Sequence, residues 1–290
     1  MEFFSRVELL ILFVLGTLFG SFGSVILLRL GKDFSVEKLK KTARGRSECP
    51  DCHHQLSWKN LIPLYSFLAQ GGECSFCWKK ISLLYPFLEI ALWVIFVLTA
   101  FFVGSLIGRQ ATTFELWLTM AIFLATNWGL FLIVVWDIMT YELHLPVWIL
   151  VTFFSLFPQF LNLTGNYQIA FASSLLLGGI FYLIFWWSKL YVKKKYNLDN
   201  QEWFGEGDVF LAFTLWSLFP FIFESQHISF SFLSLFSLAF WFVLLACLFW
   251  LVSYFFFHKQ KLEWAGDIIP FLPAMVASFW TLMLVARWLV

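Results

Sequence analysis

Long apolar stretches constrain the fold of this chain more than any other feature. Crossing a bilayer as a helix takes about 20 consecutive, mostly apolar residues, and eight stretches approach or exceed that length. They run over residues 7–30, 83–104, 114–136, 147–163, 168–192, 208–224, 229–257 and 268–290. Apolar residues follow one another in these stretches without the alternation of a membrane β-barrel strand. The pattern therefore predicts an all-α polytopic membrane protein with about eight transmembrane helices.

The composition supports the same class. The chain is 61% hydrophobic and only 13% charged, whereas soluble domains carry about 25% charged residues. The formal net charge of +1 gives no basic surplus that would indicate a nucleic-acid partner. We expect the lipid bilayer, and no nucleic acid, among the partners.

The basic residues predict an orientation. Ten of the nineteen Lys and Arg residues lie between Arg29 and Lys80, and six more lie in two loops on the same side of an eight-helix arrangement. Loops rich in Lys and Arg stay in the cytoplasm. The segment 31–82 is then cytoplasmic, and both termini lie outside. The chain divides into a first transmembrane helix (1–30), this cytoplasmic loop (31–82) and a transmembrane core (83–290).

The cytoplasmic loop carries two Cys-x-x-Cys pairs, Cys49 with Cys52 and Cys74 with Cys77, separated by 21 residues. Four thiolates in two such pairs are typical of a zinc ribbon, in which a closed tetrahedral site has a structural role. Two disulfides or four free thiols are the alternatives, and disulfides are rare in the cytosol. The sequence favours a structural Zn²⁺ ion.

Other Cys and His residues are assigned no metal. His53 and His54 are expected at the surface or behind the metal ligands. Cys247, in the middle of an apolar stretch, is expected to be a small buried side chain.

Two aspartates stand at the edges of apolar stretches, where an ionisable side chain is costly and indicates a functional site. Asp137 follows the third stretch, and Asp208 opens the sixth, after Gly205 and Gly207. The orientation above brings both to the cytoplasmic face. The alternatives are structural: Asp208 caps a helix that begins at Val209, and Asp137 anchors an interface.

Glu89, near the start of the second stretch, has two open interpretations. It pairs with Arg29 for packing, or it shapes the site.

An ordered set of motifs extends over nearly the whole chain. They are Gly20-Ser21-Phe22-Gly23-Ser24-Val25 with Arg29, Cys49-Pro50-Asp51-Cys52-His53-His54, Gly72-Glu73-Cys74-Ser75-Phe76-Cys77, Tyr85-Pro86-Phe87-Leu88-Glu89, Asp137 before Leu145-Pro146, Gly205-Glu206-Gly207-Asp208-Val209 and Ile269-Pro270-Phe271-Leu272-Pro273. In this order the motifs resemble those of the type IV prepilin peptidases, which are bifunctional leader peptidase/N-methyltransferases with a Gly-x-Gly-Asp aspartic protease motif.

The resemblance implies an activity and a location. It implies an aspartic endopeptidase of the bacterial inner membrane that cleaves prepilins or pseudopilins after a glycine, with Asp137 and Asp208 as catalytic residues. It also implies methylation of the new N-terminal amine with S-adenosylmethionine, although no glycine-rich nucleotide motif is present. Five positions depart from the family pattern, among them Ser24, where Asn is usual, and Val147, where Asp is common. Gly71 and Glu73 lie where basic residues are usual, in the region that the family links to methyl transfer, and Phe210 replaces a usual Lys.

The chemistry of the residues fits this class. Two adjacent carboxyls cannot both ionise, so they share a proton and act as acid and base. Gly205 and Gly207 allow close approach of an extended substrate.

Two rival classes differ in their sequence patterns. A transporter or assembly factor would use the aspartates as ion or proton ligands, but a transporter is expected to show two related halves, and the chain shows none. Intramembrane proteases of the presenilin kind lack a cysteine loop and have Tyr before the first aspartate, where this chain has Trp136.

Overall fold

A computed structural model describes residues 5–30, 37, 45–107, 113–140, 143–160, 167–196, 206–224, 241–252 and 271–288. Regular structure in these residues is helical, apart from two isolated β-bridges in the cysteine segment. The chain forms two compact units, Met1–Ser105 and Leu106–Val290. The predicted all-helical class is therefore confirmed for the described residues.

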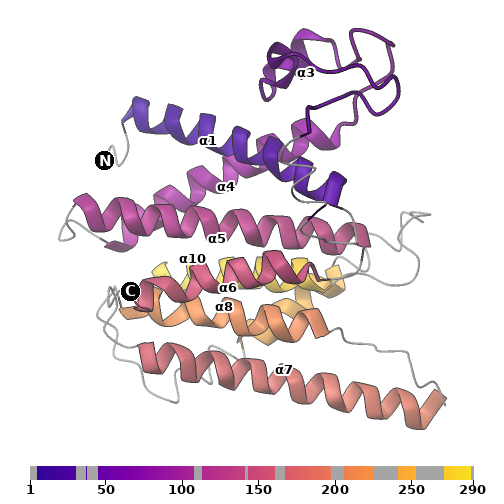
Figure 1. Cartoon of the computed structure of the whole chain (residues 1–290). Coiled ribbons are helices and arrows are strands. Elements are labelled where there is room, and N and C mark those ends of the chain that lie inside the picture. The colour runs from indigo at the N-terminus through magenta and orange to yellow at the C-terminus, as the bar shows by residue number, and fades with distance from the viewer. Residues whose placement is uncertain are drawn as a thin grey trace. The chain divides into compact units, whose positions relative to one another are not determined.

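In the first unit, helix α1 (Arg6–Val25) crosses helix α4 (Leu84–Ile107) at close range (Figure 1). A Cβ atom at Gly16 would lie 2.5 Å from Trp93 Cα, and one at Gly20 would lie 2.6 Å from Glu89 Cα. Small residues spaced four apart let two membrane helices approach backbone to backbone. The pair Gly16 and Gly20 therefore fixes this crossing.

The cysteine segment follows α1 and its π-helical extension η1 (Ile26–Leu30). It contains a 3-10 turn η2 (Trp58–Leu61) and a short helix α3 (Tyr65–Ala69). Gly71 and Gly72 follow α3 with φ angles of +62° and +75°, a conformation that glycine adopts without strain. They turn the chain from α3 into the second cysteine pair.

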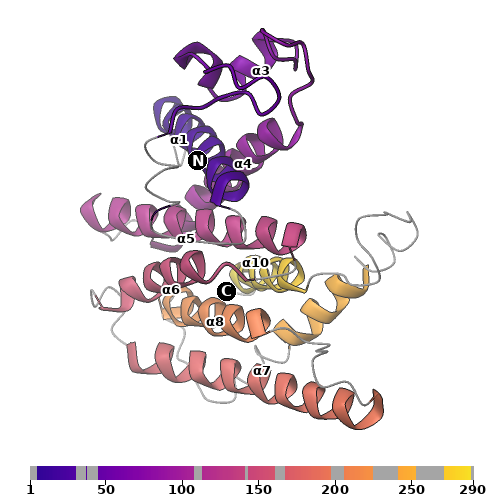
Figure 2. The same ribbon diagram turned by 45° about the vertical axis from the view of Figure 1, so that its right-hand side comes forward.

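The second unit is a stack of helices. Figures 1 and 2 show α5, then α6 and α10, then α8, then α7 in successive layers. Their bounds are α5 Thr113–Thr140, α6 Leu145–Phe160, α7 Tyr167–Tyr196, α8 Glu206–Glu224 and α10 Leu272–Trp288. The core is formed by fully buried side chains such as Trp216 of α8, Phe279 of α10 and Phe242 of a further helix, Trp241–Val252.

Within the described residues, three helices are long and apolar enough to cross a membrane: Arg6–Leu28, Leu84–Gly104 and Phe114–Thr140. Five shorter apolar helices lie at the other expected positions: Leu145–Phe157, Ser174–Leu190, Gly207–Leu218, Trp241–Val252 and Leu272–Leu282. All eight predicted stretches thus contain an apolar helix. The number of membrane crossings stays a prediction.

One burial prediction is wrong. Cys247 lies in the helix Trp241–Val252 and is exposed. An apolar stretch shows that a helix favours the membrane, but it does not show which of its residues face neighbouring helices and which face lipid.

Candidate functional site

The second unit brings Asp137 and Asp208 together. Asp137 lies in the last turn of α5, and Asp208 is the third residue of α8. Both side chains are buried, at 6% and 7% relative exposure. They are close enough for the charge of Asp208 to act on Asp137. Two residues 71 positions apart in the sequence therefore form one buried carboxyl pair.

Two helix N-termini contribute to this pair. The backbone N–H of Leu272, the first residue of α10, donates to the Asp137 carboxyl, while Asp208 sits in the first turn of α8. Helix N-termini carry partial positive charge and stabilise a nearby negative charge. The aspartate pair is therefore built where a shared negative charge is stabilised by the backbone.

One oxygen of the pair receives no hydrogen bond from the part of the chain that the structure describes. Oδ2 of Asp137 is buried, and no residue that the structure describes gives it a hydrogen bond. A buried carboxylate oxygen without a partner is costly. It is a place where a water molecule or a substrate N–H can bind.

The glycine before Asp208 is tightly packed. A Cβ on Gly207 would lie 3.0 Å from Leu143 Cβ and 3.8 Å from Leu272 Cδ1, so even alanine would press on its neighbours. Gly205 lies outside the described residues. The alternative that Asp208 caps a helix beginning at Val209 is wrong, because α8 already begins at Glu206.

His144 was not singled out from the sequence, yet it lies beside the Asp137 region. It is buried at 5% exposure, and its ring packs edge-on against Trp136, with centroids 4.6 Å apart. Its Nδ1 accepts the backbone N–H of Val147 at 3.4 Å, which caps the start of α6. Burial lowers the pKa of His144, so the ring is neutral near pH 7. Its position just before Leu145-Pro146, at a helix start, was the available signal.

Helix α8 is held against α6 by hydrogen bonds. The Trp148 indole N–H donates to Phe210 O at 3.0 Å and to Thr214 Oγ1 at 2.8 Å, and Thr214 also bonds Thr152 at 2.8 Å. The Trp148 ring lies against that of Phe210, with centroids 4.7 Å apart. Polar contacts of this kind fix the position of helices in a membrane. Phe210, which replaces the usual family Lys, has a packing role here.

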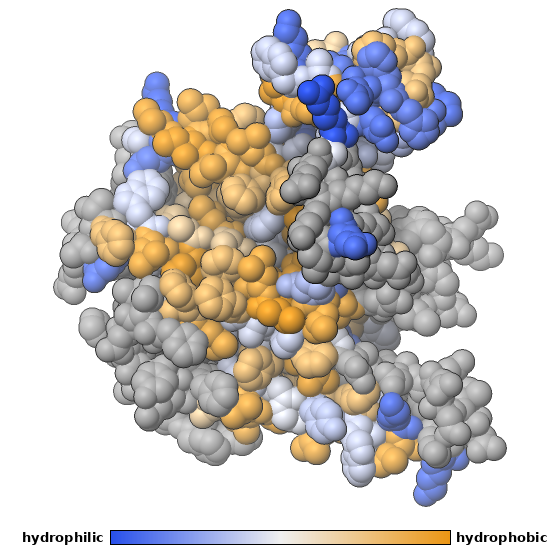
Figure 3. All heavy atoms as spheres, in the orientation of Figure 1, coloured by the Kyte–Doolittle hydropathy of each residue, from blue (hydrophilic) through white to orange (hydrophobic). Residues whose placement is uncertain are grey.

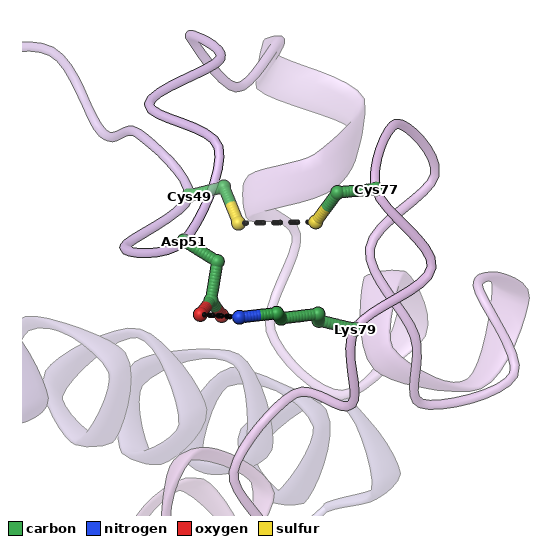
Figure 4. Close-up of polar contacts among 4 residues, drawn as sticks. All are labelled: Cys49, Asp51, Cys77 and Lys79. Carbon is green, nitrogen blue, oxygen red and sulfur yellow. Dashed lines mark hydrogen bonds and ion pairs between the residues drawn. The ribbon is translucent and has the colours of Figure 1, made fainter.

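In the first unit, the four predicted metal ligands come together. The Sγ atoms of Cys49, Cys52, Cys74 and Cys77 all lie within 4.8 Å of one another. Cys49 Sγ and Cys77 Sγ are 3.9 Å apart (Figure 4). Zn–S bonds of about 2.3 Å in a tetrahedron place two sulfurs about 3.8 Å apart. The four thiols fit a Zn²⁺ ion, whose contribution would be to hold the segment folded.

The two cysteine pairs share one backbone arrangement. In each pair, the backbone N–H of the first cysteine donates to the carbonyl of the residue five positions later. The backbone N–H of the residue after the second cysteine donates to the carbonyl of the first cysteine. The bonds are Cys49 N to His54 O, His53 N to Cys49 O, Cys74 N to Lys79 O and Trp78 N to Cys74 O, at 2.8–3.0 Å. The repetition indicates two similar turns built around one centre.

The residue after each pair is strained. His53 and Trp78 have φ angles of 55° and 62°, in the left-handed region that favours glycine. Both side chains are exposed, so packing does not explain them. The hydrogen bonds of the two turns therefore keep these residues in the left-handed conformation.

The backbone of the second turn also acts on its thiols. The N–H groups of Phe76 and Cys77 lower the pKa of Cys74 to about 7. For Cys77, the N–H of Lys79 lowers the pKa, but burial and the neighbouring thiols outweigh it and raise the pKa to about 12. Four clustered thiols therefore resist full ionisation until a cation neutralises them.

Two side-chain contacts join the two turns. Lys79 Nζ lies 2.7 Å from Asp51 Oδ1 (Figure 4). The rings of His54 and Phe76 stack, with centroids 3.4 Å apart. The ion pair is partly exposed and is worth about 1 kcal/mol or less. His53 and His54 are exposed and stay outside the thiol cluster.

Glu89 connects the cysteine segment to the membrane helices. Its Oε2 accepts the backbone N–H of Leu64, just before α3, at 2.7 Å, and the Ser21 hydroxyl of α1 also donates to it. Its side chain is buried at 6% exposure. The side chain of Arg29 lies outside the described residues, so the predicted pairing with Glu89 stays a prediction.

Comparisons with known proteins place the chain in a family. The family model of the Bacterial Peptidase A24 N-terminal domain matches residues 14–103. A prepilin leader peptidase/N-methyltransferase of Pseudomonas aeruginosa is 30% identical over 236 residues, which are 71% of this chain and 73% of that protein. The chain belongs to the prepilin leader peptidase family.

Other members of this family match over shorter regions. The Myxococcus xanthus protein of the same name is 38% identical over 114 residues, and the Vibrio cholerae protein is 32% identical over 91 residues. These matches cover 39% and 31% of this chain, and 30% and 36% of the two relatives. The matched region thus spans about a third of either relative. No solved structure matches the chain.

Proposed function

We propose that this chain is an integral-membrane aspartic endopeptidase that removes the leader peptide from prepilins or pseudopilins, cutting after a glycine. The observation that carries the proposal is the buried pair of Asp137 and Asp208, contributed by the ends of two different helices. The relatives named as prepilin leader peptidases support the substrate class.

The pair performs hydrolysis by sharing one proton. The ionised carboxyl takes a proton from water as the water oxygen attacks the scissile carbonyl, and the protonated carboxyl donates to the carbonyl oxygen. The C–N bond then breaks, and a proton passes to the leaving amine. Oδ2 of Asp137, without a donor among the described residues, supplies an acceptor position for the water.

The surrounding residues place the two carboxyls. Leu272 N–H orients Asp137, and tight packing at Gly207 against Leu143 sets the approach of α8. Trp148 braces the first turns of α8 through Phe210 and Thr214. Each contact holds a carboxyl in position without touching the substrate.

A second activity, N-methylation of the new N-terminus, is part of the proposal because the relatives are named as N-methyltransferases. S-adenosylmethionine would supply the methyl group. The zinc-binding thiols Cys49, Cys52, Cys74 and Cys77 would hold the cysteine segment that the family links to this step. Gly71, where the family favours a basic residue, has a left-handed φ of +62° that a basic side chain would adopt only with strain.

The location completes the proposal. The chain lies in the bacterial inner membrane, with the aspartate pair and the cysteine segment on the cytoplasmic side, where the basic leader of a substrate lies.

One assay tests both activities. The purified protein is incubated with a prepilin, and the N-terminal sequence and mass of the product are read. Cleavage after glycine supports the peptidase, and a product heavier by one methyl group supports the second activity. An intact prepilin after long incubation with folded protein would refute the peptidase proposal.

A further inference from the structure

The cysteine segment exposes large apolar side chains that its own fold does not cover. On α3, Tyr65 is 61% exposed and Leu68 is 76% exposed, three residues apart and thus on one side of the helix. On η2, Trp58 is 70% exposed and Leu61 is 43% exposed, again three residues apart. We define these four residues as the η2–α3 face.

This face is attached to the end of a membrane helix. Glu89, in the second turn of α4, accepts the N–H of Leu64 at 2.7 Å, and Leu64 directly precedes α3. The bond is short and partly buried, so breaking it would leave polar groups without a partner, which is costly. Helix α3 therefore cannot move far from the first turns of α4.

Helix α4 itself presents one apolar stripe. Exposed residues recur at steps of three and four from Leu83, directly before the helix, almost to its end, namely Leu83, Phe87, Ile90, Val94, Leu98 and Phe101. The helix is long and apolar enough to span a membrane, so a stripe of this kind is suited to contact with lipid. It begins at Leu83, which is 74% exposed, at the same end of α4 to which α3 is attached.

The types of residue match the bilayer–water boundary. Trp and Tyr concentrate where acyl chains meet headgroups, and lysines beside them attract anionic lipid. Lys59 Nζ lies 5.7 Å from the centre of the Trp58 ring, and Lys80 is exposed. Figure 3 shows apolar and hydrophilic side chains together on this segment, and an apolar surface over α1 (Figure 3).

We propose that the η2–α3 face docks on the headgroup region of an anionic lipid bilayer and continues the lipid-facing stripe of α4. The cysteine segment is then held at the membrane surface rather than free in the cytosol. A new substrate N-terminus emerging from the membrane would remain beside it.

Fluorescence quenching in nanodiscs tests this placement. A genetically encoded fluorescent amino acid replaces Leu68 in the full-length protein, and a matched variant carries it at Gln55, an exposed polar position of the same segment. Nanodiscs contain phosphatidylglycerol, with or without lipids that carry a nitroxide on the headgroup. Retained zinc shows that each labelled segment is folded.

We expect the Leu68 probe to lose about half of its emission in nitroxide discs, because a docked apolar face lies within about 5–10 Å of the headgroup boundary. The Gln55 probe should change little. Absence of quenching at Leu68 overturns the proposal. So does equal quenching at both positions, since then no particular face docks. Quenching at Leu68 that disappears when a prepilin binds would also overturn it, because the face would then belong to the substrate.

Discussion

Replacing Gly207 with alanine tests how tightly the aspartate site is constructed. The new Cβ would lie 3.0 Å from Leu143 Cβ, where contacts closer than 3.4 Å are uncommon, so α8 or the segment before α6 must move by a few tenths of an ångström. Overpacking of this kind costs about 1–3 kcal/mol. Up to about 1 kcal/mol returns from the better helix propensity of alanine. The variant should therefore remain folded with a displaced Asp208.

The expected consequence is a loss of activity rather than of protein. Since a displacement of 1 Å costs about 100-fold in rate, a shift of a few tenths should lower kcat/KM for prepilin cleavage by about 10-fold. The matched control is Gly179→Ala in α7, where a Cβ would meet nothing within 4 Å. It should keep wild-type kcat/KM with equal or higher thermal stability. Wild-type kcat/KM in Gly207→Ala would refute the packing argument.

Three further predictions concern the first unit and the orientation. Cys49→Ser or Cys74→Ser should remove most bound zinc and loosen the cysteine segment, because metal binding contributes about 10 kcal/mol or more to folding such modules. Part of the cleavage activity should remain, because Asp137 and Asp208 lie in the second unit. Purified protein without zinc would contradict the metal assignment. Glu89→Ala should speed hydrogen exchange in α3, since leaving a buried donor without its partner costs about 1–3 kcal/mol, while Glu89→Gln, which can still accept from Leu64, should exchange more slowly than Glu89→Ala. A membrane-impermeant thiol reagent should label Arg109→Cys in intact cells and the native Cys49–Cys77 segment only after permeabilisation; the reverse pattern would invert the topology.

The sequence predicted the helices well because bilayer length dictates long apolar stretches. The stretch 114–136 became α5, Thr113–Thr140. It predicted the start of α8 less well, because Glu206 and Gly207 are helical although they lie outside the apolar run. The exposed side of Cys247 could not be predicted, because an apolar stretch of uniform character does not indicate which residues face lipid.

The candidate site was predicted in part. The spacing of the cysteines was sufficient to predict their cluster, because each Cys-x-x-Cys turn presents two thiols and two such turns can share one metal ion. The donor to Asp137, the N–H of Leu272, could not be predicted, because it is a backbone group more than 130 residues away in the sequence. The burial of His144 follows from tertiary packing, which no local pattern records.

The central claim is that Asp137 and Asp208 act as one catalytic unit, and prepilin turnover by their Asn variants tests it most directly. Asp137→Asn, Asp208→Asn and the double variant are compared with Asp51→Asn, which alters a partly exposed aspartate of the cysteine segment. We predict that either single change abolishes cleavage while the protein still inserts and folds. The double variant should be no worse than the single ones, because residues that act as a unit are non-additive, and Asp51→Asn should cleave normally. Near-normal turnover in either single variant would contradict the account.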